Sequence, residues 1–151
     1  MINEIYNYMK LNDSLFCSGM PTAQQLPSFS ENGIQVVINL ATSKSEGAVP
    51  NEKELVESQG IEYHNIPVEW GKPTTEDLNQ FMDIMDAHKE SKVFVHCQAN
   101  YRASAFVTLY RILRLGWDRD KAFTDMNRIW NPEEYPVWED FIESHLSHND
   151  S

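Results

Sequence analysis

The sequence predicts an α/β fold: a single domain whose central, mostly parallel sheet is flanked by helices on both faces. Strand-like and helix-like segments alternate along residues 15–115, the pattern of a parallel sheet with crossover helices. Residues 34–40, I-Q-V-V-I-N-L, are apolar at nearly every position, as in a strand that is covered on both faces. The 151-residue chain is 41% hydrophobic, which is enough for one core, so we expect one domain over residues 1–151.

The first expected strand follows a polar and aromatic start. An apolar run of β-formers predicts this strand at residues 14–17. A helix is expected at residues 23–30, because Thr22 can cap its start and Asn32 with Gly33 can end it. The strand at residues 34–40 comes next.

The second part of the expected sheet follows a polar loop at residues 41–50, which we expect to act as a lid. A short helix fits between the capping residue Asn51 and the terminating residue Gly60. Residues 61–67, I-E-Y-H-N-I-P, then predict another strand.

The remaining elements are mostly helical. Their signals are helical apolar spacing, capping residues, and glycine or proline at the ends. In order we expect a helix at residues 76–88 capped by Thr74 or Thr75, a strand at 93–95, a helix at 103–115 ended by Gly116, a helix from Asp118 to about Trp130, and a last helix from Pro136 to about Leu146.

Composition and charge exclude several classes of protein. The net charge of −11 opposes binding to nucleic acids and to anionic membrane surfaces, so we expect neither partner. No apolar run reaches membrane-spanning length, and the N-terminus lacks a signal-peptide pattern. Two cysteines give no disulfide framework, so we expect a soluble protein of a reducing compartment, the cytoplasm. The sequence leaves the oligomeric state open.

The segment between the strand at residues 93–95 and the following helix concentrates the chemistry. It contains His96, Cys97 and Arg102, so a cysteine would face backbone N–H groups at a helix N-terminus. A helix N-terminus and a neighbouring cation favour the thiolate form, which is the nucleophile. Arg102 can donate two parallel hydrogen bonds to a phosphoryl group. The segment therefore predicts an anion site that holds a nucleophile.

Four stretches in order resemble one known family. They are S-G-M-P-T at residues 18–22, G-I-Q-V-V-I-N-L at 33–40, Y-H-N-I-P-V-E-W at 63–70, and V-F-V-H-C-Q-A-N-Y-R-A-S-A-F at 93–106. This ordered set resembles the bacterial cysteine-dependent phosphatases of the dual-specificity type, and more narrowly their β-lactamase-hydrolase-like branch. The resemblance covers residues 15–115, and the ordered set is more specific than any one stretch.

The resemblance implies a phosphoester hydrolase without cofactor or metal, acting on a phosphoprotein or a small phosphoester through a phospho-cysteine on Cys97. Arg102 would bind the phosphate, and His96 would tune the thiol. The backbone of the loop would cradle the phosphate, with contributions from Gln98, Ala99, Asn100, Tyr101 and Ala103. Ser104 is a further candidate, because its hydroxyl could donate to the sulfur as that sulfur leaves.

The loop departs from the usual family pattern in its length. The family pattern is His-Cys-x5-Arg, whereas four residues separate Cys97 from Arg102 here. Asn100 takes the usual glycine position, which asparagine tolerates because it adopts left-handed backbone angles more readily than most residues. Either the loop is one residue shorter or the arginine has moved within a loop of normal length.

A phosphatase also needs an acid that protonates the leaving group. The family usually places an aspartate just after the strand that corresponds to residues 61–67, and Glu69 occupies that place. The neighbouring Trp70 could desolvate the carboxyl and favour its protonated form. Asp77 is the alternative, although a carboxylate in the first turn of a helix is explained by capping and by the helix dipole.

Plainer explanations exist for several candidates. Cys97 could be a buried structural thiol, Arg102 a surface charge, and Glu69 a solvated loop residue. Cys17 is expected to be an inert strand residue, with a redox partnership to Cys97 as the alternative. The histidines outside the loop, which are His64, His88, His145 and His148, do not cluster in sequence with carboxylates or cysteines, so no metal site is expected.

Two other functional hypotheses remain open. A rhodanese-like sulfurtransferase also has a Cys-x4-Arg loop between a strand and a helix, and it carries a persulfide on its cysteine. A catalytically weak phosphate-binding module would keep the loop without turnover. The loop length favours the sulfurtransferase, whereas the upstream stretches at residues 18–22 and 33–40 match the phosphatase.

Overall fold

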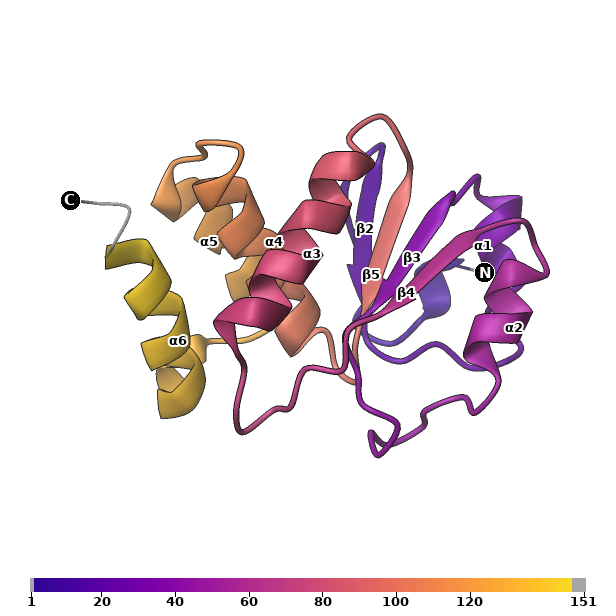
Figure 1. Cartoon of the computed structure of the whole chain (residues 1–151), viewed down its shortest axis with the longest axis horizontal. Coiled ribbons are helices and arrows are strands. Elements are labelled where there is room, and N and C mark those ends of the chain that lie inside the picture. Colours follow the sequence, from indigo (N-terminus) through magenta and orange to yellow (C-terminus); the bar gives the residue numbers. More distant parts are fainter. Residues whose placement is uncertain (1, 148–151) are drawn as a thin grey trace.

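The computed structural model describes residues 2–147, which form one five-stranded sheet with helices on both faces (Figure 1). Its elements, in chain order, are η1 (Ile2–Glu4), β1 (Met9–Asn12), β2 (Leu15–Ser18), α1 (Ser28–Glu31), β3 (Val36–Asn39), α2 (Glu52–Glu57), β4 (Glu62–Asn65), α3 (Thr75–Ala87), β5 (Val93–His96), α4 (Tyr101–Leu113), α5 (Arg119–Asn127), η2 (Pro132–Glu134) and α6 (Pro136–Ser147). The predicted fold class is confirmed.

The sheet has the strand order β1-β2-β5-β3-β4. Strands β2, β5, β3 and β4 are parallel, and β1 pairs with β2 in the antiparallel sense. The sequence did not predict β1, because only Met9 of its four residues is buried and the segment lacks an apolar run. The edge position explains this composition, since an edge strand needs little apolar surface.

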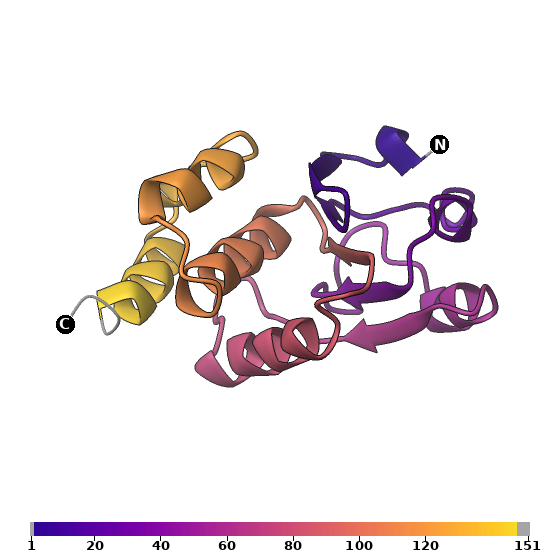
Figure 2. The ribbon, with the colours of Figure 1, turned by 90° about the horizontal axis from the view of Figure 1, so that it is seen from above.

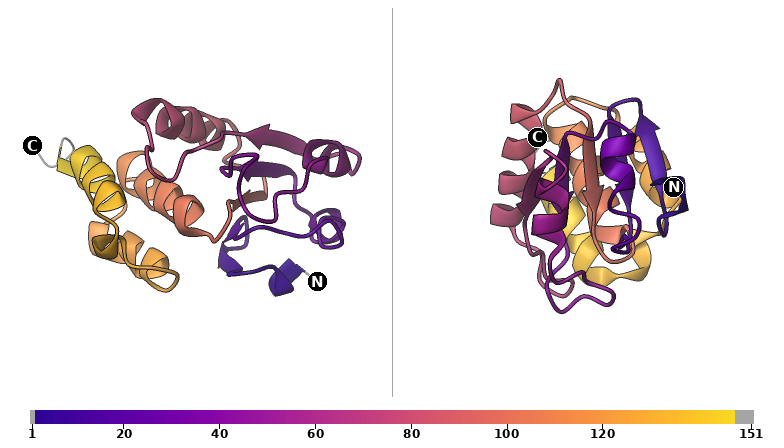
Figure 3. Two further views of the ribbon diagram at one scale, coloured as in Figure 1. Left: turned by 90° about the horizontal axis from the view of Figure 1, so that it is seen from below. Right: turned by 90° about the vertical axis from the view of Figure 1, so that its right-hand side faces the viewer.

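Both faces of the central strands are covered, as predicted for residues 34–40. In β5, Val93 and Val95 join the core beneath α3, α4 and α6, whereas Phe94 packs on the other face against Phe16 and Phe29. Alternate residues of a strand point to opposite faces, so a strand buried on both sides must be apolar throughout. Figures 2 and 3 show α1 and α2 on one side of the sheet and α3, α4, α5 and α6 on the opposite side.

Helix α4 lies in the middle of the larger helical layer, between the sheet and the C-terminal helices (Figure 1). Its side chains are buried at every position from 102 to 112. Because the helix is buried on all sides, the segment is apolar without an amphipathic pattern. The helix begins at Tyr101, two residues earlier than predicted, which places Arg102 in its first turn.

Side-chain N-caps confirm the predicted starts of two helices, α3 and α5. The side chain of Thr74 accepts a hydrogen bond from the Asp77 N–H at 3.1 Å, and that of Asp118 accepts one from the Lys121 N–H. The helix predicted at residues 23–30 is wrong in extent: α1 spans only Ser28–Glu31 and has no side-chain cap. No helix within residues 2–147 is long and apolar enough to cross a membrane.

Candidate active site

The carboxyl ends of the parallel strands bring four polar residues into one row. The register aligns Ser18 of β2 with His96 of β5, His96 with Asn39 of β3, and Asn39 with Asn65 of β4. Ligands of open α/β sheets bind beyond this edge, at the carboxyl ends of the strands. Cys97 follows directly after His96, so it stands at the edge where a ligand is expected.

The loop after Cys97 closes through a left-handed residue. Asn100 has φ +70° and is the N-cap of α4, so it fills the usual glycine position as predicted. Its side-chain Nδ2 donates to the Asn7 carbonyl oxygen at 2.8 Å, and the Asn7 side chain donates to the Ala99 carbonyl oxygen at 3.0 Å. The N-terminal segment therefore fixes the loop from outside.

Gly19 of the S-G-M-P-T stretch supports the same loop. A Cβ atom at this position would lie 2.8 Å from the Gln98 carbonyl oxygen and 2.8 Å from Cδ2 of Tyr6. The next residue, Met20, donates its N–H to the Gln98 carbonyl oxygen at 2.9 Å. A glycine is required here because the two segments approach so closely.

The sulfur of Cys97 lies at the N-terminus of α4. The side chain is 1% exposed, and the Ala103 N–H points at Sγ with an N–S distance of 3.4 Å. The first N–H groups of a helix have no partner within the helix and carry the positive end of its dipole. The structure thus brings the sulfur to a site that favours negative charge.

Arg102 is turned inward and buried at 5% exposure. Its Nη1 donates to the Val68 carbonyl oxygen at 2.6 Å, and its Nη2 lies 3.5 Å from the Ser45 hydroxyl. No carboxylate within residues 2–147 forms an ion pair with it, whereas the other buried arginine, Arg111, is paired with Asp125 at 2.7 Å. Buried charges are normally paired. The Arg102 guanidinium is an exception, because it lacks an anionic partner among the described residues.

Cys97 and Arg102 share one pocket of about 270 Å³. Its lining consists of Trp70, Cys97, Gln98, Ala99, Tyr101 and Arg102. Arg102, in the first turn of α4, therefore lies on the same side as the sulfur despite the Cys-x4-Arg spacing.

Five aromatic rings form a continuous wall behind this pocket. Tyr101 stacks on Trp130 with ring centroids 4.8 Å apart, and Trp70 stacks on Trp138 at 5.3 Å. Tyr135 closes the group through an edge contact to Trp70 at 5.3 Å. Trp130 and Trp138, which come from the C-terminal part of the chain, thus support the two rings that line the pocket.

Glu69 lies beside the pocket in the sequence but is not among its lining residues. It is exposed, in a tight turn where its carbonyl oxygen accepts the Lys72 N–H at 3.1 Å. Asp77 lies in the first turn of α3, where its backbone bonds to the Thr74 cap. Neither carboxylate lines the pocket, so the identity of the acid stays a prediction.

The expected donation from Ser104 to the sulfur is not what the structure shows. The Ser104 hydroxyl donates to the Asn100 carbonyl oxygen at 2.7 Å and accepts the Trp130 Nε1–H at 3.0 Å. A serine within a helix commonly donates to the carbonyl oxygen four residues earlier, so the hydroxyl hydrogen of Ser104 is already used in this bond. Ser104 therefore connects the loop to the aromatic wall.

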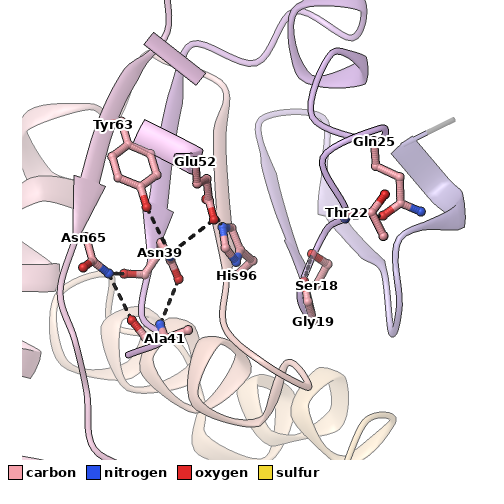
Figure 4. A network of polar contacts seen from close by, with 10 residues as sticks. All are labelled: Ser18, Gly19, Thr22, Gln25, Asn39, Ala41, Glu52, Tyr63, Asn65 and His96. Carbon is pink, nitrogen blue, oxygen red and sulfur yellow. Dashed lines mark hydrogen bonds and ion pairs between the residues drawn. The ribbon is translucent and has the colours of Figure 1, made fainter. Parts of the chain in front are cut away.

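His96 forms a buried pair that the sequence did not reveal. Its Nε2 lies 2.5 Å from Oε2 of Glu52, and the two side chains are 0% and 4% exposed (Figure 4). Asn39 joins the network by donating to Oε1 of Glu52 at 3.4 Å and to the Tyr63 hydroxyl at 3.0 Å. Burial and the nearby Glu52 charge raise the pKa of Tyr63 to about 12, so its hydroxyl stays protonated. This network fixes the residue that precedes the cysteine.

We expect Glu52→Ala to lower the free energy of unfolding by about 3–5 kcal/mol, because it leaves a buried polar partner unpaired. Urea unfolding followed by circular dichroism measures the loss. Glu54→Ala is the matched control, since Glu54 is exposed in the first turn of the same helix and should change stability by no more than about 0.5 kcal/mol. Equal effects of the two variants would contradict the role assigned to Glu52.

The second cysteine, Cys17, is buried and unreactive. Cys17 is 0% exposed in β2, and burial raises the pKa of its thiol to about 12. The thiol is therefore protonated at neutral pH and is a poor nucleophile. This finding agrees with the expectation of an inert strand residue.

The statement that the histidines outside the loop do not cluster with carboxylates is wrong for two of them. The side chains of Glu62, His64 and His88 meet, with one ligand atom of each within 4.8 Å of the others. Sequence spacing could not show this, because His88 follows α3 and returns to β4 only through the tertiary fold. His148 lies outside the described residues.

Comparisons with known proteins agree with this geometry. Residues 5–137 match the model of a family described as "DSP-PTPase phosphatase fused to NAD+ Kinase". The dual-specificity protein phosphatase TpbA of Pseudomonas aeruginosa is 22% identical over 124 residues, which are 81% of this chain and 54% of TpbA. The chain thus spans about half the length of the curated relatives it matches.

Solved structures give the same picture. A protein of Shewanella putrefaciens CN-32, which carries only a provisional description as a phosphatase, is 37% identical with a TM-score of 0.84, covering 95% of this chain and 91% of its own. The complex of TpbA with phosphotyrosine shares the fold, with a TM-score of 0.71 at 16% identity over 90% of this chain and 82% of its own.

The resemblance to cysteine-dependent phosphatases is therefore confirmed, while the narrower β-lactamase-hydrolase-like branch stays a prediction. Because the family model matches most of the chain and the chain carries the cysteine and arginine loop in a shared pocket, this protein belongs to the dual-specificity-type phosphatase family that the model describes.

Proposed function

We propose that this chain hydrolyses phosphomonoesters through a phospho-cysteine intermediate on Cys97. The observation that carries the proposal is Arg102, a buried guanidinium with no carboxylate partner in the described part of the chain, in the same pocket as the cysteine. In a protein of net charge −11, such a cation is well explained as the receptor of an anionic group. A phosphoryl group matches its two-donor geometry.

The proposed reaction uses Cys97, Arg102 and the loop N–H groups of the pocket, together with Glu69 as the predicted acid. The Cys97 thiolate attacks phosphorus, and the bond from phosphorus to the leaving oxygen breaks as that oxygen takes a proton from Glu69. Arg102 and the N–H groups of the first turn of α4 hold the non-bridging oxygens, where charge is spread in the transition state. Water then attacks the phospho-cysteine, Glu69 takes its proton, and the phosphorus–sulfur bond breaks to release phosphate.

The pocket wall supports an aromatic substrate. Trp70 and Tyr101 present their rings beside Cys97, and Trp70 is 36% exposed. An additional ring packed against such a pair gains roughly 0.5–1.5 kcal/mol beyond its buried area. We therefore infer that aryl phosphates, including phosphotyrosine, bind better than alkyl phosphates.

A free thiol nucleophile also agrees with the expected cytoplasmic location, which stays a prediction.

Two assays on the same untagged protein test the function. We expect release of p-nitrophenol from p-nitrophenyl phosphate in the presence of EDTA, and no transfer of sulfur from thiosulfate to cyanide. Sulfur transfer without phosphatase turnover would instead establish the rhodanese-like hypothesis. Phosphate binding without either activity would establish the binding module.

A comparison of two substrates with different leaving groups tests which residue acts as the acid. Phenyl phosphate needs a proton on its leaving oxygen, whereas p-nitrophenolate leaves easily without one. Glu69→Gln should therefore lower kcat/KM for phenyl phosphate by roughly 10²-fold or more and should affect p-nitrophenyl phosphate much less. Asp77→Asn is the comparison: if that variant shows the leaving-group dependence instead, the acid is Asp77, and if neither does, the proton comes from water.

A further inference from the structure

We propose that Glu62, His64 and His88 form a binding site for Zn²⁺ away from the Cys97 pocket. Glu62 and His64 both lie on β4, and residues two apart on a strand share one face. His88 is the C-cap residue of α3, and its ring meets that of His64 with ring centroids 6.1 Å apart. Glu62 begins its parallel strand whereas Cys97 follows the end of another, so the two sites differ in position along the sheet.

Both imidazoles approach the same carboxylate oxygen. The Nε2 atom of His64 lies 2.5 Å from Oε2 of Glu62, and the Nε2 atom of His88 lies 2.9 Å from it. Zinc bonds nitrogen and oxygen ligands at ~2.0–2.2 Å, so ligand atoms already within 4.8 Å of one another need only small side-chain shifts to share an ion. The exposed Glu62 side chain can supply that shift.

The hydrogen bond of His88 supplies an independent argument. Its Nδ1 lies 2.8 Å from the Ile84 carbonyl oxygen. A carbonyl oxygen only accepts, so Nδ1 carries the hydrogen and the Nε2 of the neutral ring presents a lone pair. Metal-bound histidines are oriented in this way, with the second nitrogen donating to a backbone carbonyl.

This tautomer places a lone pair of His88 against a carboxylate oxygen 2.9 Å away, which is repulsive unless a cation intervenes. That cation is either a proton on His88 or a metal ion between the groups.

The donor set selects the metal. Two imidazoles and one carboxylate suit Zn²⁺ and leave one coordination position for water. The ion would connect β4 to the end of α3. It would bind the folded chain and not the unfolded one, so it would raise the melting temperature.

The test uses untagged protein carrying Cys97→Ser, which removes the thiol as a competing ligand; the remaining Cys17 is fully buried. Calorimetric titration with Zn²⁺ should show one equivalent bound, and Co²⁺ should give the absorption bands of a low-coordinate site. His64→Gln and His88→Gln should each weaken binding more than about tenfold, since even the loss of an outer-shell partner costs that much. His145→Gln is the control, because that histidine bonds Thr75 and lies outside the cluster.

Thermal unfolding gives a second readout. Zn²⁺ at about 100 times its dissociation constant should raise the melting temperature by roughly 5–10 °C in the Cys97→Ser protein, and by much less in the His88→Gln variant. Absence of binding would show that a proton on His88 is the cation and would overturn the proposal. One equivalent bound with unchanged affinity in both histidine variants would overturn it too, by placing the metal elsewhere.

Discussion

Cys97→Ser is expected to abolish phosphatase turnover, lowering kcat by at least about 10⁴-fold, while the fold and phosphate binding persist. A helix N-terminus favours a thiolate, but it does not form an alkoxide from a serine hydroxyl. The substitution changes one atom in a pocket whose other contacts come from Arg102 and the loop backbone. Turnover of p-nitrophenyl phosphate and titration with inorganic phosphate measure the two properties separately.

Cys17→Ser is the matched control for that experiment. Cys17 is buried in β2 with a protonated thiol, so this variant should keep turnover in any protein that remains folded. Comparable turnover in the Cys97→Ser protein would exclude the covalent mechanism. Loss of turnover in Cys17→Ser without loss of structure would indicate a redox partnership between the two cysteines.

Arg102→Lys should lower kcat/KM by about 10²–10³-fold although the side chain stays cationic. The guanidinium already uses Nη1 for the Val68 carbonyl oxygen and holds Nη2 near Ser45, which fixes the direction of its remaining donors. A lysine ammonium cannot make the same bonds and two more to a phosphoryl group. Kinetics with p-nitrophenyl phosphate and competitive inhibition by vanadate or tungstate measure the loss.

Arg114→Lys controls for the general effect of replacing an arginine on the same segment. Arg114 lies at the far end of α4 and pairs with Asp83 and Asp86 at the surface, so its replacement should leave kinetics unchanged. If inhibitor affinity in the Arg102→Lys protein stays within a few-fold of the parent, the phosphate-binding role is wrong. The loop N–H groups would then bind the anion alone.

Local sequence patterns determined the order of the elements and the place of the loop. The apolar runs at β3 and β5 must be strands buried on both faces, and the step from β5 to α4 must present Cys97 to helix N–H groups. Asn100 was predictable as a left-handed residue because few other residues accept that conformation. These features depend on neighbours in sequence, so the sequence alone was enough.

Edge strand β1 and the extent of α1 were not predictable in this way. Only Met9 of β1 is buried, and its pairing with β2 is a contact between segments rather than a property of either one. The turn before α1 is occupied by Thr22 and Gln25, which bond each other and leave a helix of four residues. The Gln59 side chain also bonds the Ser30 N–H and the Leu26 carbonyl oxygen, and local propensity is weak where such tertiary contacts supply competing hydrogen bonds.

Only the tertiary structure decided which distant side chains meet. Glu52 lies 44 residues from His96 and joins it because α2 packs above the carboxyl end of β5 (Figure 4). His88 reaches Glu62 from the end of α3, and Trp70 meets Trp138 of α6 to form the pocket wall. The physical reason is that a polar or aromatic side chain has many favourable partners in principle, and the packing of the whole chain selects one of them.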